Sequence, residues 1–277
     1  MLDSKFEKLR KQFGIATPED WQNIRPEWVL ATPGVGSATL QFLRMYLANL
    51  GLTLQNDGCP KQWQELLGKT RFGGLQISEQ DEADVCPFTI LIDSQEKHPF
   101  VFQGLRHDSD NAGRPLVVPI MWKSLGAHHG DYSLSGWEGH VAIERKSMND
   151  AHGTFLGWSE RRERFEDELE YLSGIECAAV VIECTRGQLY ANAPSQGKKS
   201  SQENAKILMR TVLSWEQRFS VPFMFCDTRR LAEVEAFRLL QQFFRHKVQE
   251  AKAVSADREI AASQKSVDEV ERMLAGL

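Results

Sequence analysis

The amino-acid sequence predicts an α/β domain with a mixed central sheet flanked by helices, preceded by a small all-helical region. Short apolar runs predict buried strands, and amphipathic helical stretches alternate with the later strands. Two of the strands are close enough along the chain to form a β-hairpin, which gives the sheet an antiparallel start. A chain of 277 residues is long enough for one large domain with small appendages.

The first 54 residues show helical periodicity only. Phe6, Leu9 and Phe13 recur three and four residues apart, which is the spacing of one face of a helix. The same spacing predicts a second helix over 38–50, after a short glycine-containing turn. We therefore expect an all-helical region over 1–54.

Composition divides the rest of the chain into three parts. Residues 55–85 are poor in aliphatic side chains and rich in Asn, Asp, Gly, Gln and Glu, so they are predicted to be a linker. Residues 86–254 are predicted to form the α/β domain. The final residues, 255–277, are predicted to be a polar tail with a fraying helix over 267–274.

Within the α/β domain, the clearest strand is 178–182, which is apolar at every position and is therefore expected to be buried on both faces. The predicted hairpin joins 130–134 to 140–143 through a loop that contains two glycines. The complete prediction is strands at 88–92, 130–134, 140–143, 178–182 and 221–226, and helices at 159–172, 205–219 and 229–250.

The composition, with 42% hydrophobic and 26% charged residues, is that of an ordinary globular protein. No apolar run approaches the ~20 residues that cross a bilayer, and the polar start lacks the apolar stretch of a signal peptide. We therefore expect no membrane partner, and a location in the cytoplasm of a bacterial or phage-infected cell, or in the nucleus of a eukaryotic one. The net charge of −5 argues against coating nucleic acid through bulk positive charge, although a small site can act against the sign of the whole.

The five cysteines form no C-x-x-C pair, and no Cys/His spacing typical of zinc is present. Isolated thiols in a reducing compartment are expected.

The stretch that carries chemistry begins at Gly130-Asp131 and continues at Glu144-Arg145-Lys146, at the ends of the predicted hairpin strands. Side chains two apart on a strand share a face, so Glu144 and Lys146 point the same way and Arg145 the other. If the hairpin pairs as predicted, Asp131 lies beside Glu144. Two such carboxylates repel one another unless a cation intervenes, and Mg²⁺ is held by one or two carboxylates with its waters. Two carboxylates, a metal ion and a lysine are what phosphodiester hydrolysis needs.

The alternative is an E-x-K surface ion pair, which is common at strand ends and worth only ~0–1 kcal/mol. The neighbouring acids favour the catalytic interpretation, because Asp93 and Glu96 follow the first strand and Asp131 begins the second. Three strand ends thus place acidic groups near one lysine. A contribution to solubility alone does not account for this arrangement.

The pattern G-D at 130–131 followed by E-R-K-x-x-x-D at 144–150 resembles the signature of XPF-type nucleases, the structure-selective endonucleases of repair and recombination. Upstream, I-D-S-Q-E at 92–96 is similar to that family's strand ending in D-x-R-E, with Gln95 in place of the usual arginine. The resemblance covers roughly residues 86–250.

This resemblance implies a restriction-endonuclease-like fold, dependence on Mg²⁺ or Mn²⁺, and hydrolysis of DNA strands. The implied roles are metal binding by Asp131 and Glu144 with Glu96 and Asp93 assisting, and catalysis by Lys146 with Arg145 and Asp150 in support.

A second motif, T-P-G-V-G over 32–36, lies between two predicted helices. It resembles the helix-hairpin-helix module, which grips the DNA backbone, and this implies backbone contacts at Gly34 and Gly36. The alternative is a plain connector between helices. In XPF-type proteins the module usually follows the nuclease domain, whereas here it precedes it. Lys198 and Lys199, in a predicted loop, are candidate phosphate contacts, or else solvated loop charges.

Together these features predict a metal-dependent DNA endonuclease that prefers branched, flap or fork DNA in repair or recombination. DNA is the expected partner, and the family resemblance also suggests a homodimer. One alternative is a restriction or defence nuclease with little structure preference. Another is a non-catalytic DNA-binding scaffold, but a decayed site of that kind is expected to have lost Asp131, Glu144 or Lys146, and all three are present.

Overall fold

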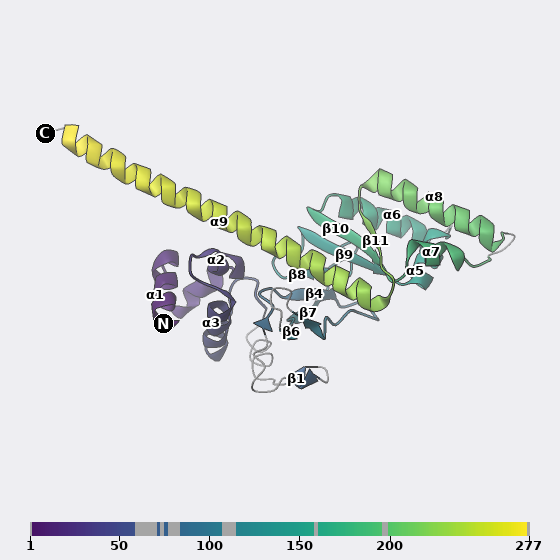
Figure 1. Cartoon of the computed structure of the whole chain (residues 1–277), viewed down its shortest axis with the longest axis horizontal. Helices are drawn as coiled ribbons and strands as arrows, with labels where there is room; N and C mark the ends of the chain where they lie inside the picture. Colours follow the sequence, from purple (N-terminus) through teal and green to yellow (C-terminus); the bar gives the residue numbers. More distant parts are fainter. Residues whose placement is uncertain are drawn as a thin grey trace. The chain divides into compact units, whose positions relative to one another are not determined.

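The computed structural model describes residues 2–58, 71–72, 75–76, 84–106, 115–157, 160–195 and 199–275. The chain forms two compact units, one of Met1–Lys69 with Phe244–Leu277 and the other of Thr70–Phe243. Figure 1 shows the elements of both in chain order. The G-D and E-R-K motifs both belong to the second unit.

The first unit contains a group of short helices. These are α1 (Leu2–Phe13), the 3₁₀ helix η1 (Pro18–Asn23), α2 (Pro26–Ala31) and α3 (Ser37–Asn49). Both α1 and α2 pack on α3 (Figure 1). Leu40, Leu43 and Leu47 recur three and four residues apart, so one face of α3 is buried, together with Leu9 and Trp21.

The second unit is built on a six-stranded sheet. In spatial order its strands are β11 (Phe223–Phe225), β10 (Cys177–Ile182), β9 (Val141–Lys146), β8 (Tyr132–Leu134), β4 (Ile90–Asp93) and β7 (Ile120–Lys123). β8 runs antiparallel to β9 and β4, whereas the other neighbouring pairs are parallel. The predicted α/β class with a mixed central sheet is therefore confirmed.

Two smaller sheets accompany this one. A three-stranded sheet has the order β3 (Asp84–Val85), β6 (Pro115–Val117) and β5 (Leu105–Arg106). β1 (Arg71–Phe72) pairs antiparallel with β2 (Leu75–Gln76).

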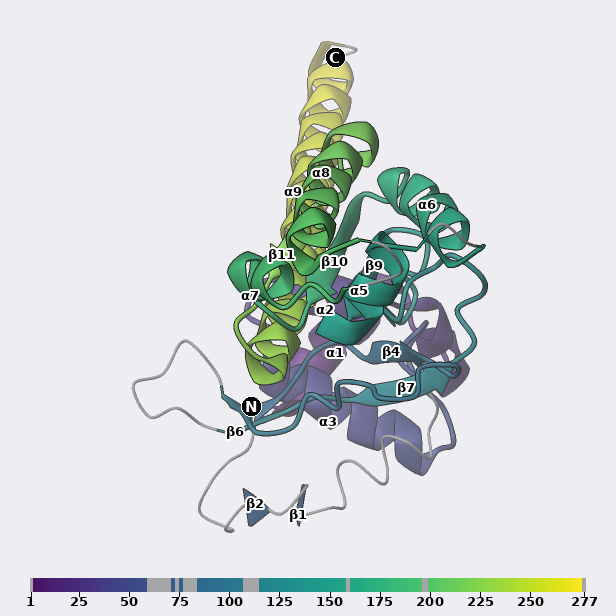
Figure 2. The ribbon, with the colours of Figure 1, turned by 90° about the vertical axis from the view of Figure 1, so that its right-hand side faces the viewer.

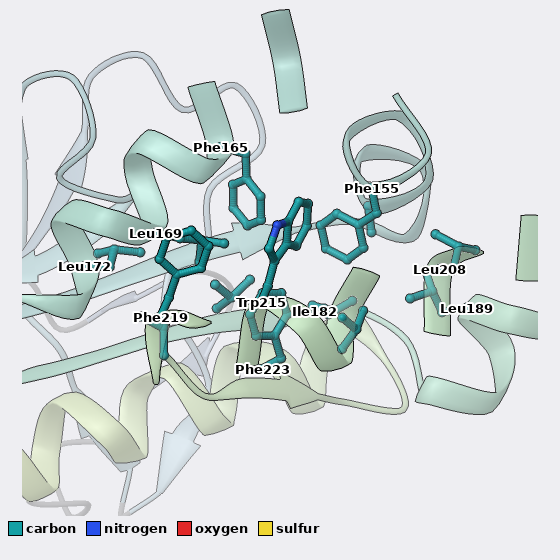
Figure 3. Packing of buried hydrophobic residues seen from close by; sticks show 14 of the residues in the cluster. Phe155, Phe165, Leu169, Leu172, Ile182, Leu189, Leu208, Trp215, Phe219 and Phe223 are labelled. Carbon is teal, nitrogen blue, oxygen red and sulfur yellow. The ribbon is translucent and has the colours of Figure 1, made fainter. Parts of the chain in front are cut away.

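Four helices pack over the β9–β10 part of the main sheet. They are α5 (Met148–Phe155), α6 (Glu160–Ser173), α7 (Arg186–Ala191) and α8 (Ser201–Phe219). In Figure 2, α5 lies in front of β9, with α6 and α7 on either side. The core beneath them centres on Trp215, whose ring centroid is 5.2 Å from those of both Phe155 and Phe165 (Figure 3). Ile182 of β10 belongs to the same cluster, so this core ties the strands to the helices that carry the candidate site.

The last element, α9 (Arg229–Ala275), is one continuous helix. It extends well past the helix predicted over 229–250 and through most of the predicted polar tail. The reason is compositional: no Gly or Pro occurs between residues 229 and 275, and Ala, Glu, Lys, Gln and Arg are frequent.

The sequence prediction also missed β5, β6, β7, α5 and α7. For β6 and β7 the cause is visible, since Pro115 and Pro119 interrupt the apolar run over 115–122. Proline cannot donate to a strand ladder, so it argues against a strand unless it lies at a strand end or on an edge. Here Pro115 begins β6, Pro119 lies between the strands, and β7 is an edge strand of the main sheet.

Two findings bear on the compositional expectations. None of the helices in the described ranges is long and apolar enough to cross a lipid bilayer. The cysteines that the structure describes are free thiols, namely Cys86, Cys177, Cys184 and Cys226, whereas Cys59 lies outside the described residues.

Candidate active site

The register of the hairpin brings Asp131 and Glu144 together. Tyr132 of β8 pairs with Ile143 of β9 in the antiparallel ladder, so the residue before Tyr132 meets the residue after Ile143. The Asp131 N–H donates to Ile143 O at 2.8 Å, and the Arg145 N–H donates to Asp131 Oδ2 at 2.8 Å. The predicted juxtaposition of the two carboxylates therefore follows from the backbone itself.

Gly130 is required by this close approach. Its φ of +71° lies in the left-handed region, and a Cβ at this position would stand 2.9 Å from Ile143 O. A larger residue would push the hairpin strands apart just where Asp131 meets β9. This explains in physical terms why glycine precedes the aspartate.

Lys146 completes the cluster on the helix-covered face of β9. It forms an ion pair with Glu144, and its Nζ is 4.0 Å from Oε2 of Glu168 on α6. The Phe165 ring centroid is 4.7 Å from the same nitrogen. The side chains of Glu144, Lys146 and Glu168 are only 6%, 15% and 17% exposed, so their charges interact with little screening by water.

These contacts shift the protonation of the cluster. Burial, and then the charge of Glu144, raise the pKa of Asp131 well above its usual range. Burial and the same neighbour raise the pKa of Glu168. Burial alone would lower the pKa of Lys146, but the carboxylates of Glu144 and Glu168 outweigh it and raise that pKa. Lys146 is therefore a cation at neutral pH.

Arg145 points to the opposite face of β9, as strand alternation predicts. Its guanidinium donates to Glu183 Oε1 at 2.7 Å and to Glu96 Oε1 at 3.2 Å. Glu183 also pairs with Arg229 at the start of α9. Burial raises the pKa of Glu96, but the His98 N–H and the Arg145 charge outweigh it, so that this pKa is lowered.

The other two predicted acids have local partners. Asp93 Oδ1 accepts from the Leu125 N–H at 3.2 Å, and Asp93 is not among the residues that line the cleft described next. Asp150 lies in the first turn of α5, where its N–H donates to the N-cap oxygen of Ser147 at 3.1 Å. The Ser147 hydroxyl donates in return to the Asp150 carboxylate at 2.5 Å.

A cleft of about 340 Å³ opens over this cluster. It is wide and mostly polar, and basic as well as acidic side chains border it. The lining residues are Gln95, Glu96, Lys97, His98, Asp131, Glu144, Arg145, Lys146, Asp150, Thr154 and Arg161. The sequence motif and the loop after β4 therefore face one shared space.

Whether these residues suit a metal ion can be judged from their charges. Across the described ranges, no group of three or more His, Cys, Asp or Glu side chains has the arrangement of a ready-made metal site. Yet, among the described residues, the carboxyl groups of Asp131, Glu144 and Glu168 gather around the cation of Lys146, and burial together with the charge of Glu144 raises the pKa of Asp131 and of Glu168. Mg²⁺ needs only one or two protein carboxylates and keeps its waters, so Asp131 and Glu144 fit a hydrated divalent ion.

The N-terminal motif forms the turn between α2 and α3. Gly34 has a φ of +78°, a conformation that favours glycine, and Gly36 is the N-cap of α3 without a side-chain cap. The Val35 N–H donates to Thr32 O at 3.0 Å, which closes the turn. Lys8 of α1 donates to Pro33 O at 2.7 Å, so a basic side chain lies against this turn.

The structure describes one of the two candidate loop lysines, Lys199. Lys198 lies outside the described residues. Lys199 is half-buried and directly precedes Ser200, the N-cap of α8.

Sequence reasoning missed two residues near the cleft, Glu168 and Thr154. For Glu168 a signal was available, because it lies three residues after Phe165 and four before Leu172, two positions of the apolar stripe on α6. An acid at that spacing shares the buried face of its helix.

Comparisons with known proteins add a distant likeness. The chain matches no protein-family model and no curated protein. Among solved structures it is similar to XPF from Aeropyrum pernix, with 15% identity and a TM-score of 0.39 over 58% of this chain and 69% of that one. A structure of XPF from Aeropyrum pernix in complex with DNA gives 15% identity and a TM-score of 0.39 over 57% and 66% of the two chains. A likeness at this level does not carry a functional assignment.

Proposed function

We propose that this protein is a divalent-metal-dependent DNA endonuclease whose reaction takes place in the cleft over Asp131, Glu144 and Lys146. The observation that carries the proposal is the meeting of these three side chains beside an open cleft, where two carboxyl groups lie next to one lysine. Structural ion pairs in a protein interior are normally balanced, because unpaired buried charge is costly. An excess of acid beside an open cleft is what a cation-binding site requires.

In the proposed mechanism each residue has a defined task. Asp131 and Glu144 would hold a hydrated Mg²⁺ or Mn²⁺ ion, which would polarise the phosphate and lower the pKa of its bound waters. Lys146, as a cation, stabilises the negative charge that develops on the phosphate oxygens during attack by water. Glu96 and Arg145 keep the loop after β4 against β9, and Asp150 holds the first turn of α5 at the cleft.

DNA binding is assigned to basic groups at the cleft rim and to the N-terminal turn. Arg161 and Lys97 line the cleft and are exposed, so they can reach backbone phosphates. The turn at Gly34 and Gly36 offers backbone N–H groups at the start of α3 to a second stretch of backbone. A preference for branched, flap or fork DNA, and a role in repair or recombination, belong to this proposal through the motif resemblance, as does a homodimer.

The test is a cleavage assay on labelled flap, fork, junction and plain duplex DNA with Mg²⁺ or Mn²⁺. The wild-type chain is compared with Glu144→Gln and Lys146→Met, which remove one charge each at nearly constant size. We expect the wild type to cut branched DNA and both variants to be inactive. No cleavage of any substrate by the wild type would falsify the enzyme proposal and leave a DNA-binding scaffold. Equal cutting of plain and branched DNA would remove only the structure preference.

A further inference from the structure

The helix α6 surrounds the ammonium of Lys146 with groups that the nuclease motif does not contain. Oε2 of Glu168 is 4.0 Å from Nζ, and the ring centroid of Phe165 is 4.7 Å from it. Glu144, on the same strand as Lys146, provides the ion pair. The lysine therefore has two carboxylate neighbours, one from the motif strand and one from a helix that follows it.

Glu168 is built into this position. Its side chain is 17% exposed, whereas Glu160 on the same helix is 88% exposed. It shares the buried face of α6 with Phe165 and Leu172. A buried carboxylate is costly unless a cation accompanies it, and the cation within 4.0 Å of Glu168 is Lys146.

The proposed function creates a need for this second carboxylate. A metal ion held by Asp131 and Glu144 draws the Glu144 charge toward itself and repels the neighbouring ammonium. Lys146 would then lose its strand partner just when the reaction requires it to stay in place. Glu168 comes from a separate element, α6, and hydrogen-bonds the side chain of Glu144. It can therefore hold the lysine while Glu144 holds the metal.

We infer that Glu168 is a positioning residue that keeps the Lys146 ammonium in the cleft while Glu144 binds the metal ion. The inference rests on the proposed nuclease function. Glu168 acts through Lys146 and touches neither the phosphate nor the metal. Phe165 supports the same arrangement by packing its ring against the ammonium.

The first test compares Glu168→Gln with wild type and with Glu163→Gln, a matched change on the exposed side of the same helix. Glutamine keeps the size and hydrogen-bonding capacity of Glu168, so it would rescue a merely structural role. We expect kcat to fall about 10- to 100-fold in Glu168→Gln, with KM for DNA within about twofold of wild type. Glu163→Gln should match the wild type, and melting temperatures confirm that both variants fold.

Two results would overturn the inference. One is an unchanged kcat in Glu168→Gln while the wild type cleaves DNA. The other is a loss of activity that higher Mg²⁺ concentration restores, because that would make Glu168 a metal ligand. A wild-type chain that cleaves no DNA rejects the proposed function itself, so the two failures are distinguishable.

The second test needs no catalytic activity. The full chain with Mg²⁺ is treated with a trace of acetic anhydride, and mass spectrometry measures the labelling of Lys146 relative to the exposed Lys206. Replacement of the Glu168 carboxyl group should release the ammonium and raise Lys146 labelling at least fivefold in Glu168→Gln, with no change in Glu163→Gln. Equal labelling in the wild type and Glu168→Gln would contradict a holding role.

Discussion

The two faces of β9 carry clusters of charged side chains that differ in the balance between acids and bases. On one face the charges balance, because two bases meet two acids, namely Arg145, Arg229, Glu96 and Glu183. On the other face one base meets three acids, namely Lys146, Asp131, Glu144 and Glu168. The clusters meet at one point, where the side chains of Glu96 and Asp131 hydrogen-bond to one another.

This difference distinguishes a structural network from a functional one. The balanced cluster ties the loop after β4 and the start of α9 to the sheet, and its acids and bases form ion pairs with one another. The acidic cluster keeps carboxylates buried with too few cations, at a cost in stability that a bound divalent ion would offset. Activity should therefore depend on one face and stability on the other.

The largest expected effect is on cleavage by Asp131→Asn. Loss of a metal-binding carboxylate should reduce kcat/KM about 10³-fold or more, because the ion is held by so few protein ligands. The melting temperature of the metal-free variant should stay the same or rise, since a repulsive buried charge is gone. Steady-state kinetics and thermal melts in EDTA check both halves. A variant that is unstable and inactive together would make the acidic cluster merely structural.

The next effect is on stability, at Arg145→Met. The Arg145 side chain is 5% exposed, and those of Glu96 and Glu183 are 11% exposed, so this change leaves two acids without their buried partner. The free energy of unfolding should fall by about 3–5 kcal/mol in urea titrations. Arg164→Met, at an exposed pair on α6, is the control and should change it by less than about 0.5 kcal/mol. Similar losses for both variants would remove the distinction between the clusters.

The pH dependence of stability should differ in sign between the two faces. Burial and Glu144 raise the pKa of Asp131 above its ordinary 3.8, so the folded chain retains a proton that the unfolded chain releases. The contribution of Asp131 to the free energy of unfolding is therefore present at low pH, and it is lost as the pH rises from about 4 through the raised pKa. For Glu96, despite its burial, the His98 N–H and Arg145 lower the pKa below 4.5, so its contribution is present above about 4.5 and lost as pH falls.

Melting curves of the metal-free chain between pH 3 and 8 measure this contrast. Asp131→Asn should remove the loss of stability at higher pH. Glu96→Gln should weaken the loss of stability at low pH. Curves for the two variants that run parallel to that of the wild type would refute the difference in sign.

The smallest effect is expected at the rim of the acidic face. Arg161→Gln removes one exposed cation from the cleft and should weaken DNA binding about 2- to 5-fold at moderate salt. The slope of log K against log salt should decrease by about 1, the signature of one lost phosphate contact. Fluorescence anisotropy at several salt concentrations measures both, with Arg164→Gln as the control. An unchanged slope would place Arg161 outside the DNA path.

Much of the acidic face could be predicted from the sequence, because its arrangement depends on residues that are close together in the chain. Strand alternation separates Glu144 and Lys146 from Arg145, and a hairpin register places Asp131 beside Glu144. Both depend on residues close together in the chain. The apolar run at 178–182 similarly predicts β10, because nothing polar interrupts it.

The balanced face and the role of α6 could not be predicted in this way. The partners of Arg145 come from the loop after β4, from the end of β10 and, through Glu183, from α9, and only tertiary packing brings them together. Glu168 likewise reaches Lys146 because α6 packs on the sheet, which no spacing within the motif indicates. The edge strand β7 was not predicted because Pro119 immediately precedes it. The helix α9 continues beyond the predicted end because no glycine or proline occurs between residues 229 and 275.

The most direct test of the division between the two faces is calorimetric titration of the full chain with Mn²⁺. The wild type and Glu183→Gln, altered only on the balanced face, should each bind one ion in the cleft and release protons as Asp131 ionises. Glu144→Gln should bind Mn²⁺ at least tenfold more weakly. Equal Mn²⁺ affinity in the wild type and Glu144→Gln, or loss in Glu183→Gln alone, would contradict the assignment of the metal to the acidic face.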